Sequence, residues 1–362
     1  MKIAVNTGGG DAPGLNAVIR GVVLAANQKG WEVYGIKYGY MGLIDTKQII
    51  RLTPEYVWDI TDVGGTILGS AVRGNPFQYP MQGADGKVGE VDISDKVVSN
   101  FQALGFDALV AIGGDGSLSI ASKFMKKGMP IIGIPKTIDN DISATDVTFG
   151  FDTAVNTATE AIDKLHTTAK SHDRVMVVEV MGRYTGWIAL YSGISGSAHV
   201  VLLPEIPFDI EKVCQKIKRL ELIGQNYAIV VVAEGAVPSG GKMTVIEKKP
   251  GGEVRLGGIG QKVADEIEKK MGKETRFIVL GHLQRGGAPT TFDRLLCLRF
   301  GTAAVRSIEA GMFGTMVALR STEIYAVPID EAIGQMKKVS SDSDIVQTAR
   351  SLGICFGDGK QS

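Results

Sequence analysis

Short apolar segments alternate with longer amphipathic segments along most of the chain. The apolar segments are rich in β-branched residues and carry few polar interruptions, as in residues 2–7 (KIAVNT) and 227–235 (YAIVVVAEG). Near-continuous apolar runs of this length are typical of parallel strands that are covered on both faces of the sheet. The pattern predicts strands over residues 2–7, 32–38, 108–114, 130–135, 174–182, 198–205, 227–235 and 277–284.

The segments between these strands have apolar residues at helical spacing, and most of them close on a glycine, which commonly follows the last turn of a helix. The predicted helices cover residues 15–30, 117–128, 153–171, 210–224 and 259–272. Alternating strands and helices indicate an α/β fold with parallel sheets. Residues 327–359 predict a helix with an acidic start, a polar turn and a second helix.

Composition narrows the class of protein. The chain has 362 residues, of which 44% are hydrophobic and 22% are charged, and this suits a globular protein with two domains or one large domain. Lysine plus arginine number 39 and the acidic residues also number 39, so the net charge gives no general attraction to nucleic acid or to an anionic membrane. Any site for an anion must therefore be local.

The cysteines and the N-terminus bear on the compartment. Cys214, Cys297 and Cys355 lie far apart and lack the spacing of metal ligands, which fits a reducing environment. The first predicted strand meets a glycine loop within a few residues, which leaves no room for a signal peptide, and no apolar run approaches the length of a membrane span. We expect a cytoplasmic protein that binds neither nucleic acid nor membrane.

Three glycines, Gly8 to Gly10, stand between the first predicted strand and the first predicted helix. In an open parallel sheet, ligands bind beyond the carboxyl ends of the strands. Glycines let backbone amides approach a phosphate closely, and a helix N-terminus favours an anion. A turn that binds nothing is the alternative. The spacing matches neither the dinucleotide fingerprint nor the phosphate loop with its lysine.

The segment VAIGGDGSLSIA repeats this arrangement, with Asp115 between Gly114 and Gly116. A carboxylate at this place can reach a magnesium ion that bridges phosphate oxygens. The alternative is an aspartate that only caps the following helix.

The segment PKTIDND, residues 135–141, follows a predicted buried strand. Asp139 and Asp141 lie two residues apart, so an extended chain would project both carboxylates to one side. Paired carboxylates in a cleft can divide the work, because one accepts a proton from a hydroxyl while the other tunes it or helps to hold a metal. A turn rich in Asn and Asp is the alternative, but it does not explain why Lys136 and Thr137 follow a buried strand so abruptly.

Two further strand ends carry basic residues. Arg183 in VEVMGRYTGWIA could clamp a phosphoryl group with two parallel hydrogen bonds, and the pair His282 and Arg285 in VLGHLQRGG suits a sugar phosphate. Taken alone, Arg183 is equally explained as a surface arginine at a helix start, and the pair is more usually a core histidine and a solvated arginine. Five clusters of glycine and charge, all at strand ends, together favour a site that handles phosphates.

These residues resemble the 6-phosphofructokinase family. The segments that carry the resemblance occur in the family's order over nearly the whole chain and are GGDAPGLNAVIRG, GGTILGSA, GGDGS, PKTIDND, VVEVMGRYTGW, AEG and ETRFIVLGHLQRGG. The resemblance implies transfer of a phosphoryl group to the 1-hydroxyl of fructose 6-phosphate, a glycolytic reaction that uses magnesium. It also implies two doubly wound, mostly parallel-sheet α/β domains with the active site in the cleft between them. The phosphoryl-donor domain would comprise residues 1–148 and about 285–330, and the fructose 6-phosphate domain about 149–284 and 331–362.

The resemblance also implies catalytic roles. Asp139 would be the general base with Asp141 beside it, and Asp115 would hold the magnesium ion. Arg73 and Arg183 would stabilise the charge that develops on the phosphoryl oxygens. The further donor contacts implied are Gly10, Gly116, Ser117 and Lys136.

Substrate contacts follow in the same way. Those implied are Thr137, Met181, Gly182, Glu234, His282 and Arg285, the last two at or near the 6-phosphate. In the family, two arginines reach this phosphate from a neighbouring subunit, and the matching residues here are Arg174 and Arg276. The resemblance therefore implies a homo-oligomer, either a tetramer or a dimer.

Two positions bear on the identity of the phosphoryl donor. Family members that use pyrophosphate tend to carry aspartate after GGD and lysine before TIDND, whereas the usual ATP enzymes carry glycine at both places. This chain has Gly116 and Lys136, a mixed pattern. An aspartate would exclude the nucleotide by its bulk and by repelling the α-phosphate, whereas an ammonium can stabilise the leaving phosphate of either donor. We therefore predict ATP as the donor, with pyrophosphate as the alternative.

Two other classes of protein are less consistent with the sequence. Lipid kinases and NAD kinases also use a GGDG loop, but they do not need TIDND or GHLQRGG. A catalytically silent sensor of sugar phosphates or nucleotides has no need for a base aimed at the acceptor hydroxyl.

Overall fold

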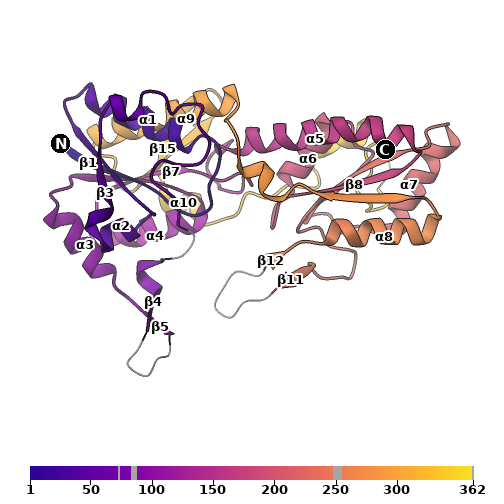
Figure 1. The fold of residues 1–362 in the computed structure, drawn as a ribbon, viewed down its shortest axis with the longest axis horizontal. Helices are drawn as coiled ribbons and strands as arrows, with labels where there is room; N and C mark the ends of the chain where they lie inside the picture. Colours follow the sequence, from indigo (N-terminus) through magenta and orange to yellow (C-terminus); the bar gives the residue numbers. More distant parts are fainter. Residues whose placement is uncertain (72–73, 83–87, 248–254, 361–362) are drawn as a thin grey trace. The chain divides into compact units, whose positions relative to one another are not determined.

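The computed structural model describes every residue except 72–73, 83–87, 248–254 and 361–362. The described residues form two compact units, each built around its own sheet (Figure 1). Unit 1 comprises Met1–Ile138, Ile142–Asp152 and Arg285–Met336. Unit 2 comprises Asp139–Asp141, Thr153–Gln284 and Lys337–Ser362.

Unit 1 is built on a seven-stranded sheet in the order β15-β14-β7-β6-β1-β2-β3. The strands from β14 to β2 are parallel to their neighbours, and the edge strands β15 and β3 are antiparallel to theirs. The strands are β1 (Lys2–Thr7), β2 (Glu32–Ile36), β3 (Ile49–Leu52), β6 (Ala108–Gly113), β7 (Ile131–Pro135), β14 (Thr315–Arg320) and β15 (Glu323–Pro328).

Helices cover both faces of this sheet because successive strand residues point to opposite faces. Ile3 and Val5 lie in one core with α1 and α9, whereas Ala4 lies in another with α3 and α4. Figure 1 shows these two pairs of helices on opposite sides of the sheet. The helices of unit 1 are α1 (Leu15–Asn27), α2 (Met41–Ile44), α3 (Ser94–Ala103), α4 (Asp115–Lys126), α9 (Thr291–Glu309) and α10 (Ile329–Ile333).

Shorter elements complete unit 1. The strands β4 (Tyr79–Gln82) and β5 (Val88–Val91) pair in antiparallel fashion. Single 3₁₀ turns occur at η1 (Thr46–Gln48), η2 (Glu55–Val57) and η3 (Pro76–Gln78).

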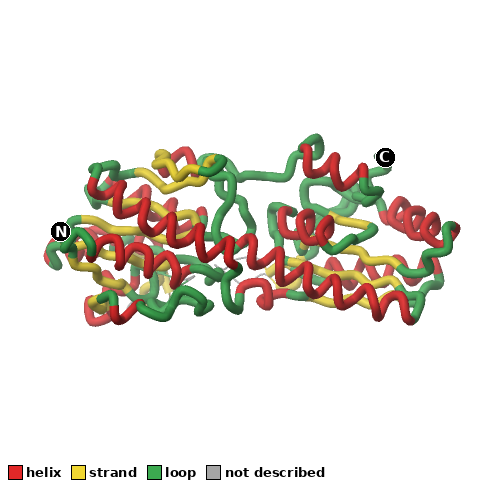
Figure 2. Tube along the Cα trace, turned by 90° about the horizontal axis from the view of Figure 1, so that it is seen from above, coloured by secondary structure: helices red, strands yellow, loops and turns green. Residues whose placement is uncertain are grey.

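Unit 2 is built on a four-stranded parallel sheet in the order β13-β8-β10-β9. Val177 and Val230 pack with α7 and α8 on one face, and α6 packs against β9 and β10. In both units the helices lie along the strands (Figure 2), which confirms the predicted α/β class with mostly parallel sheets. The elements are α5 (Phe151–Ser171), β8 (Val175–Val180), α6 (Trp187–Ser195), β9 (Val200–Leu202), α7 (Ile210–Leu222), β10 (Ala228–Ala233), β11 (Val245–Glu247), β12 (Arg255–Leu256), α8 (Ile259–Met271) and β13 (Thr275–Val279).

One predicted strand is wrong in its second half. The apolar run over residues 277–284 predicts a strand, but β13 ends at Val279 and a 3₁₀ helix, η4 (Gly281–Arg285), follows. Gly281 has a φ of 48°, a left-handed value that glycine adopts without strain and that breaks the extended chain. The apolar pattern continues through this turn because Leu280 is buried.

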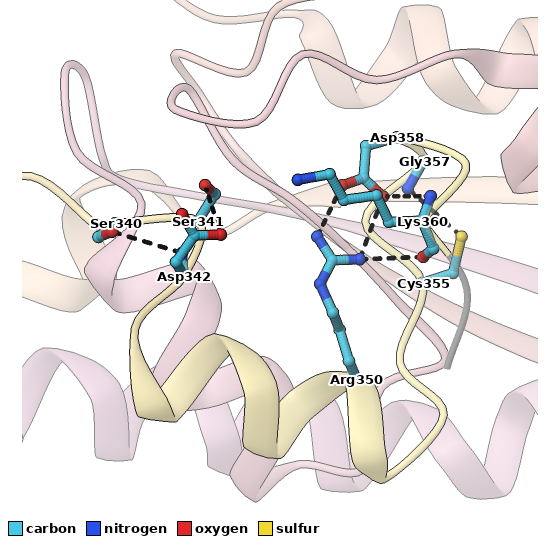
Figure 3. A network of polar contacts seen from close by, with 8 residues as sticks. All are labelled: Ser340, Ser341, Asp342, Arg350, Cys355, Gly357, Asp358 and Lys360. Carbon is cyan, nitrogen blue, oxygen red and sulfur yellow. Dashed lines mark hydrogen bonds and ion pairs between the residues drawn. The ribbon is translucent and has the colours of Figure 1, made fainter.

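The C-terminal segment folds as predicted, with α10 followed by a second helix, α11 (Asp344–Ser351). Beyond α11, Cys355 extends the edge of the unit 2 sheet, because its N–H donates to the His199 carbonyl at 3.1 Å and its carbonyl accepts from Val201 at 2.9 Å. The buried Arg350 donates to both carboxylate oxygens of Asp358, at 3.1 and 2.6 Å (Figure 3). These contacts make residues 337–360 part of unit 2.

Within the ranges that the structure describes, none of the helices is both long enough and apolar enough to cross a lipid bilayer.

Candidate active site

The first cluster of candidate residues follows three adjacent parallel strands of unit 1. Because β1, β6 and β7 are neighbours, their carboxyl ends share one edge of the sheet. The Gly8 N–H donates to the Ile112 carbonyl at 2.9 Å, and the Lys136 N–H donates to the Gly113 carbonyl at 2.9 Å. The structure therefore brings together the loops that follow all three strands.

The glycines in this cluster are required by close approach. A Cβ on Gly8 would lie 2.6 Å from Ser117 Oγ, and a Cβ on Gly113 would lie 2.3 Å from Ser117 Cβ. Gly9 has a φ of 77°, in the left-handed region. Only glycine lets the first loop pack this tightly against the start of α4, so the backbone amides of the loop and of the helix N-terminus lie near each other.

Two cationic side chains contact the glycine loop. Lys136 is only 4% exposed, and its Nζ donates to the Gly10 carbonyl oxygen. Arg285 Nη1 donates to the Asp11 carbonyl at 3.1 Å and lies 3.2 Å from the position of a Cβ on Gly10. A buried ammonium and a guanidinium therefore place positive charge at a loop that could bind phosphate.

Asp115 and Gly116 begin helix α4 and are exposed. A Cβ built on Gly116 meets no atom within 4 Å, so the space beside Asp115 is open. Arg73, the other predicted donor contact, lies outside the described residues.

The donor atoms present fit a magnesium ion that comes with a phosphate ligand. Across the part of the chain with described positions, no three His, Cys, Asp or Glu side chains form a group that could hold a metal ion. Asp115 supplies one carboxylate beside the open space at Gly116. Magnesium is commonly held by one or two carboxylates together with substrate phosphates and water.

The second cluster begins with the segment Asp139–Asp141 of unit 2. Thr185 Oγ1 donates to the Asp139 carbonyl at 3.1 Å, and the Lys337 N–H donates to the Asp141 carbonyl at 2.9 Å. Asn140 between them is 3% exposed and has a φ of 51°. The extended conformation assumed for this segment from sequence is therefore wrong, because Asn140 adopts the left-handed region that Asn tolerates better than most residues. The preceding Thr137 belongs to unit 1, where its carbonyl accepts from Thr148 Oγ1 at 2.7 Å.

The ends of β8 and β10 place further candidates beside one another. The Glu234 N–H donates to the Val180 carbonyl at 2.9 Å, and the Gly235 N–H donates to the Gly182 carbonyl at 3.1 Å. A Cβ on Gly235 would lie 2.0 Å from the Arg183 carbonyl oxygen, so the two loops are in direct contact. Met181, Gly182, Arg183 and Glu234 therefore form one group.

Two residues that the sequence did not single out fix this group. The buried Gln284 accepts from the Met181 N–H at 3.3 Å, which ties the loop after β8 to the η4 turn that carries the exposed His282. The half-buried Glu205 accepts from the Gly186 N–H at 3.1 Å and from the Val339 N–H at 3.0 Å. Burial raises the pKa of Glu205 above its usual value, and these backbone donors oppose that shift.

Arg174 and Arg276 lie at the other end of the unit 2 sheet. Arg174 precedes β8, and Arg276 is the second residue of β13, opposite Met176 of β8. Both arginines form ion pairs with Glu274, at 2.7 and 2.5 Å. Met181 follows the carboxyl end of the same six-residue strand. A strand of that length spans about 20 Å, so the structure does not bring these arginines to the Met181–Glu234 group.

The chain is similar to phosphofructokinases named for either phosphoryl donor. The family described as "Phosphofructokinase" matches residues 2–308. A relative from Chloroflexus aurantiacus named "ATP-dependent 6-phosphofructokinase" is 51% identical over 358 residues, covering 99% of this chain and 98% of the relative. A relative from Amycolatopsis methanolica named "Pyrophosphate--fructose 6-phosphate 1-phosphotransferase" is 51% identical over 343 residues, covering 94% of this chain and 96% of the relative.

A solved structure of phosphofructokinase from Pichia pastoris in the T-state matches with a TM-score of 0.79 and 32% identity. The match covers 92% of this chain and 35% of that longer chain.

Proposed function

We propose that this chain, which belongs to the phosphofructokinase family, transfers the γ-phosphoryl group of ATP to the 1-hydroxyl of fructose 6-phosphate, giving fructose 1,6-bisphosphate and ADP. The observation that carries the choice of ATP is the open space at Gly116, where a Cβ would meet no atom within 4 Å. A nucleotide needs room behind its β-phosphate, whereas pyrophosphate does not. The names of relatives about half identical over nearly their full length support the same donor.

The first cluster, at the carboxyl ends of β1, β6 and β7, is the one that we assign to the phosphoryl donor. There, backbone amides around Gly10 and Ser117 bind phosphate oxygens, and Lys136 stabilises the leaving phosphate. Lys136 is suited to this because its ammonium is already held at the Gly10 carbonyl and needs little reorganisation. Gly116 leaves room for the α-phosphate, and Arg73 adds positive charge at the transferring group. Asp115 would hold the magnesium ion of the nucleotide complex, which neutralises charge on the phosphates when it is bound.

In the second cluster, which we assign to the phosphoryl acceptor, Asp139 accepts the proton of the 1-hydroxyl as general base, and Asp141 lies two residues further along the chain. Arg183 stabilises the negative charge on the transferring phosphoryl group. The fixed conformation of the Asp139–Asp141 segment, held from both sides by Thr185 and Lys337, supports this role because a base must be positioned before the reaction. The proposed substrate contacts are Thr137, Met181, Gly182, Glu234, His282 and Arg285.

We also propose that Arg174 and Arg276 bind the 6-phosphate in the active site of a neighbouring subunit. Their position at the end of β8 opposite to Met181 supports this, since within unit 2 they lie a strand length from the Met181–Glu234 group. The protein would then be a homo-oligomer, either a tetramer or a dimer, and a lone subunit would have an incomplete site. A cytoplasmic location stays a prediction, as does the placement of one active site between the two domains.

Pyrophosphate is the second candidate donor. Lys136 and the Amycolatopsis methanolica relative favour it, because the lysine is typical of pyrophosphate enzymes and the relative carries that activity in its name. ATP is preferred because Gly116 carries no carboxylate that would repel the α-phosphate.

The acceptor and the base are tested together with Asp139→Ser. The wild type should convert fructose 6-phosphate and MgATP to a product whose new phosphate is on carbon 1, as assigned by phosphorus and carbon NMR. The variant should lose turnover by about three powers of ten or more while binding fructose 6-phosphate with similar affinity in calorimetry. A wild type that binds the sugar phosphate without turnover would instead be a sensor.

A further inference from the structure

Lys337 is hydrogen-bonded to residues around the proposed base. Its Nζ donates to Asn140 Oδ1 at 2.9 Å, its backbone N–H donates to the Asp141 carbonyl at 2.9 Å, and its carbonyl accepts from Trp187 Nε1 at 2.8 Å. The ammonium also lies over the Trp187 ring, 5.8 Å from its centroid. All of these residues belong to unit 2.

The residue that receives the ammonium has an uncommon backbone. Asn140 is 3% exposed with a φ of 51°, a conformation that costs free energy in a residue with a side chain. Such a conformation persists only where its surroundings hold it. A charge-assisted hydrogen bond to the buried Asn140 amide oxygen is well suited to that purpose.

The turn is therefore held at each of its three residues. Thr185 Oγ1 holds the Asp139 carbonyl, Lys337 Nζ holds the Asn140 side chain, and the Lys337 N–H holds the Asp141 carbonyl. Two residues further on, the Val339 N–H donates to Glu205, which also accepts from the Gly186 N–H. Residues 337–339 thus join the turn to the loop after β8.

We infer that Lys337 is a positioning residue for phosphoryl transfer, because its ammonium bond to Asn140 fixes the turn that carries Asp139. This inference rests on the proposed function, since it takes Asp139 as the base. Lys337 lies beyond residues 2–308, the range that the family description matches, although relatives such as the one from Chloroflexus aurantiacus match nearly the whole chain. A role for Lys337 in the reaction is therefore additional to what the match over residues 2–308 supports.

The substitution Lys337→Met tests the inference, because it removes the ammonium and keeps the length of the side chain and both backbone hydrogen bonds. We expect kcat to fall about 10- to 100-fold, the range expected when a catalytic group is slightly misplaced. The KM values for fructose 6-phosphate and ATP should change less than about threefold, since the substrates contact other residues. Lys337→Arg, which can still donate to Asn140, should recover most of the lost kcat.

The matched control is Lys338→Met, which removes the same charge from the next, exposed residue and should leave kcat unchanged. A double-mutant cycle identifies the partner. Asn140→Gly removes the acceptor and tolerates the positive φ, so Lys337→Met should cost little further activity in that background.

The outcomes separate the inference from the proposed function. A wild type without fructose 1,6-bisphosphate formation overturns the proposed function. An active wild type with an unchanged kcat in Lys337→Met overturns the inference alone. So does a loss that appears only in KM, a loss that arginine does not repair, or a double mutant whose loss equals the product of the two single losses.

Discussion

Gly116→Asp tests how this fold selects its phosphoryl donor. The substitution should be accepted by the fold, because a Cβ at position 116 meets no atom within 4 Å and the residue lies in the first turn of α4. Replacing glycine in a helix and adding a negative charge near a helix N-terminus are each favourable by about 0.3–1 kcal/mol. Any loss of activity would therefore report on the ligand and not on the stability of the protein.

The expected effect on ATP follows from Coulomb's law. The repulsion between a carboxylate and one charge of the α-phosphate about 5 Å away is about 3 kcal/mol at an effective dielectric constant of about 20. Residue 116 is exposed, and screening by solvent and salt reduces this to about 1–3 kcal/mol. The kcat/KM for ATP should fall about 5- to 150-fold, whereas pyrophosphate has no α-phosphate attached to a nucleoside and should be unaffected.

The assay measures initial rates of fructose 1,6-bisphosphate formation against the concentration of each donor at saturating fructose 6-phosphate. Gly116→Asn is the matched control, because it has nearly the same size without the charge. If Asn and Asp reduce kcat/KM for ATP equally, bulk and not charge selects the donor. If Asp leaves the value for ATP within about threefold of the wild type, which is less than 1 kcal/mol, the reasoning from position 116 is wrong.

Three other experiments test separate parts of the account. Lys136→Met should lower kcat about 10- to 100-fold with whichever donor is used, since a charge-assisted contact is lost, and unchanged rates would remove Lys136 from the donor site. Subunits carrying Asp139→Ser and subunits carrying Arg276→Ala should each be inactive but should recover activity when mixed and reassembled; absence of recovery would contradict sites shared between subunits. Burial lowers the pKa of His199 to about 4, so the imidazole binds a proton more weakly in the folded protein than in the unfolded chain. The stability that His199 contributes is therefore present above about pH 6.5 and is lost as the pH falls toward 4. His199→Asn, which can still accept from the Ile229 N–H, should make the urea midpoint of unfolding depend less on pH over that interval. An unchanged dependence on pH would exclude His199 as its source.

Much of the fold follows from local patterns. The inner strands β1, β6, β7, β8 and β10 carry continuous apolar runs and fall within the segments predicted for them, whereas β3, β14 and β15 were not predicted. The sequence did not locate the end of β13, because the apolar run continues through Leu280 although Gly281 turns the chain. Whether an apolar residue continues a strand or begins a turn depends on one dihedral angle that hydrophobicity does not report.

The candidate site was predictable where its residues follow strands and was missed where it depends on distant segments. Gly8–Gly10, Asp115 and Lys136 stand out because glycine and charge after an apolar run are unusual. Lys337 gives no such signal, since it lies in a polar turn and its partner Asn140 is 197 positions away along the chain. Long-range contacts of this kind are set by the packing of whole elements, so a single sequence does not reveal them.

The measurement that tests the central claim most directly is the initial rate of fructose 1,6-bisphosphate formation from fructose 6-phosphate and magnesium, run in parallel with ATP and with pyrophosphate. The account predicts a rate with ATP and a much lower rate with pyrophosphate, which would make Gly116 the residue that decides the donor. A rate with pyrophosphate alone would contradict it and would assign that decision to Lys136.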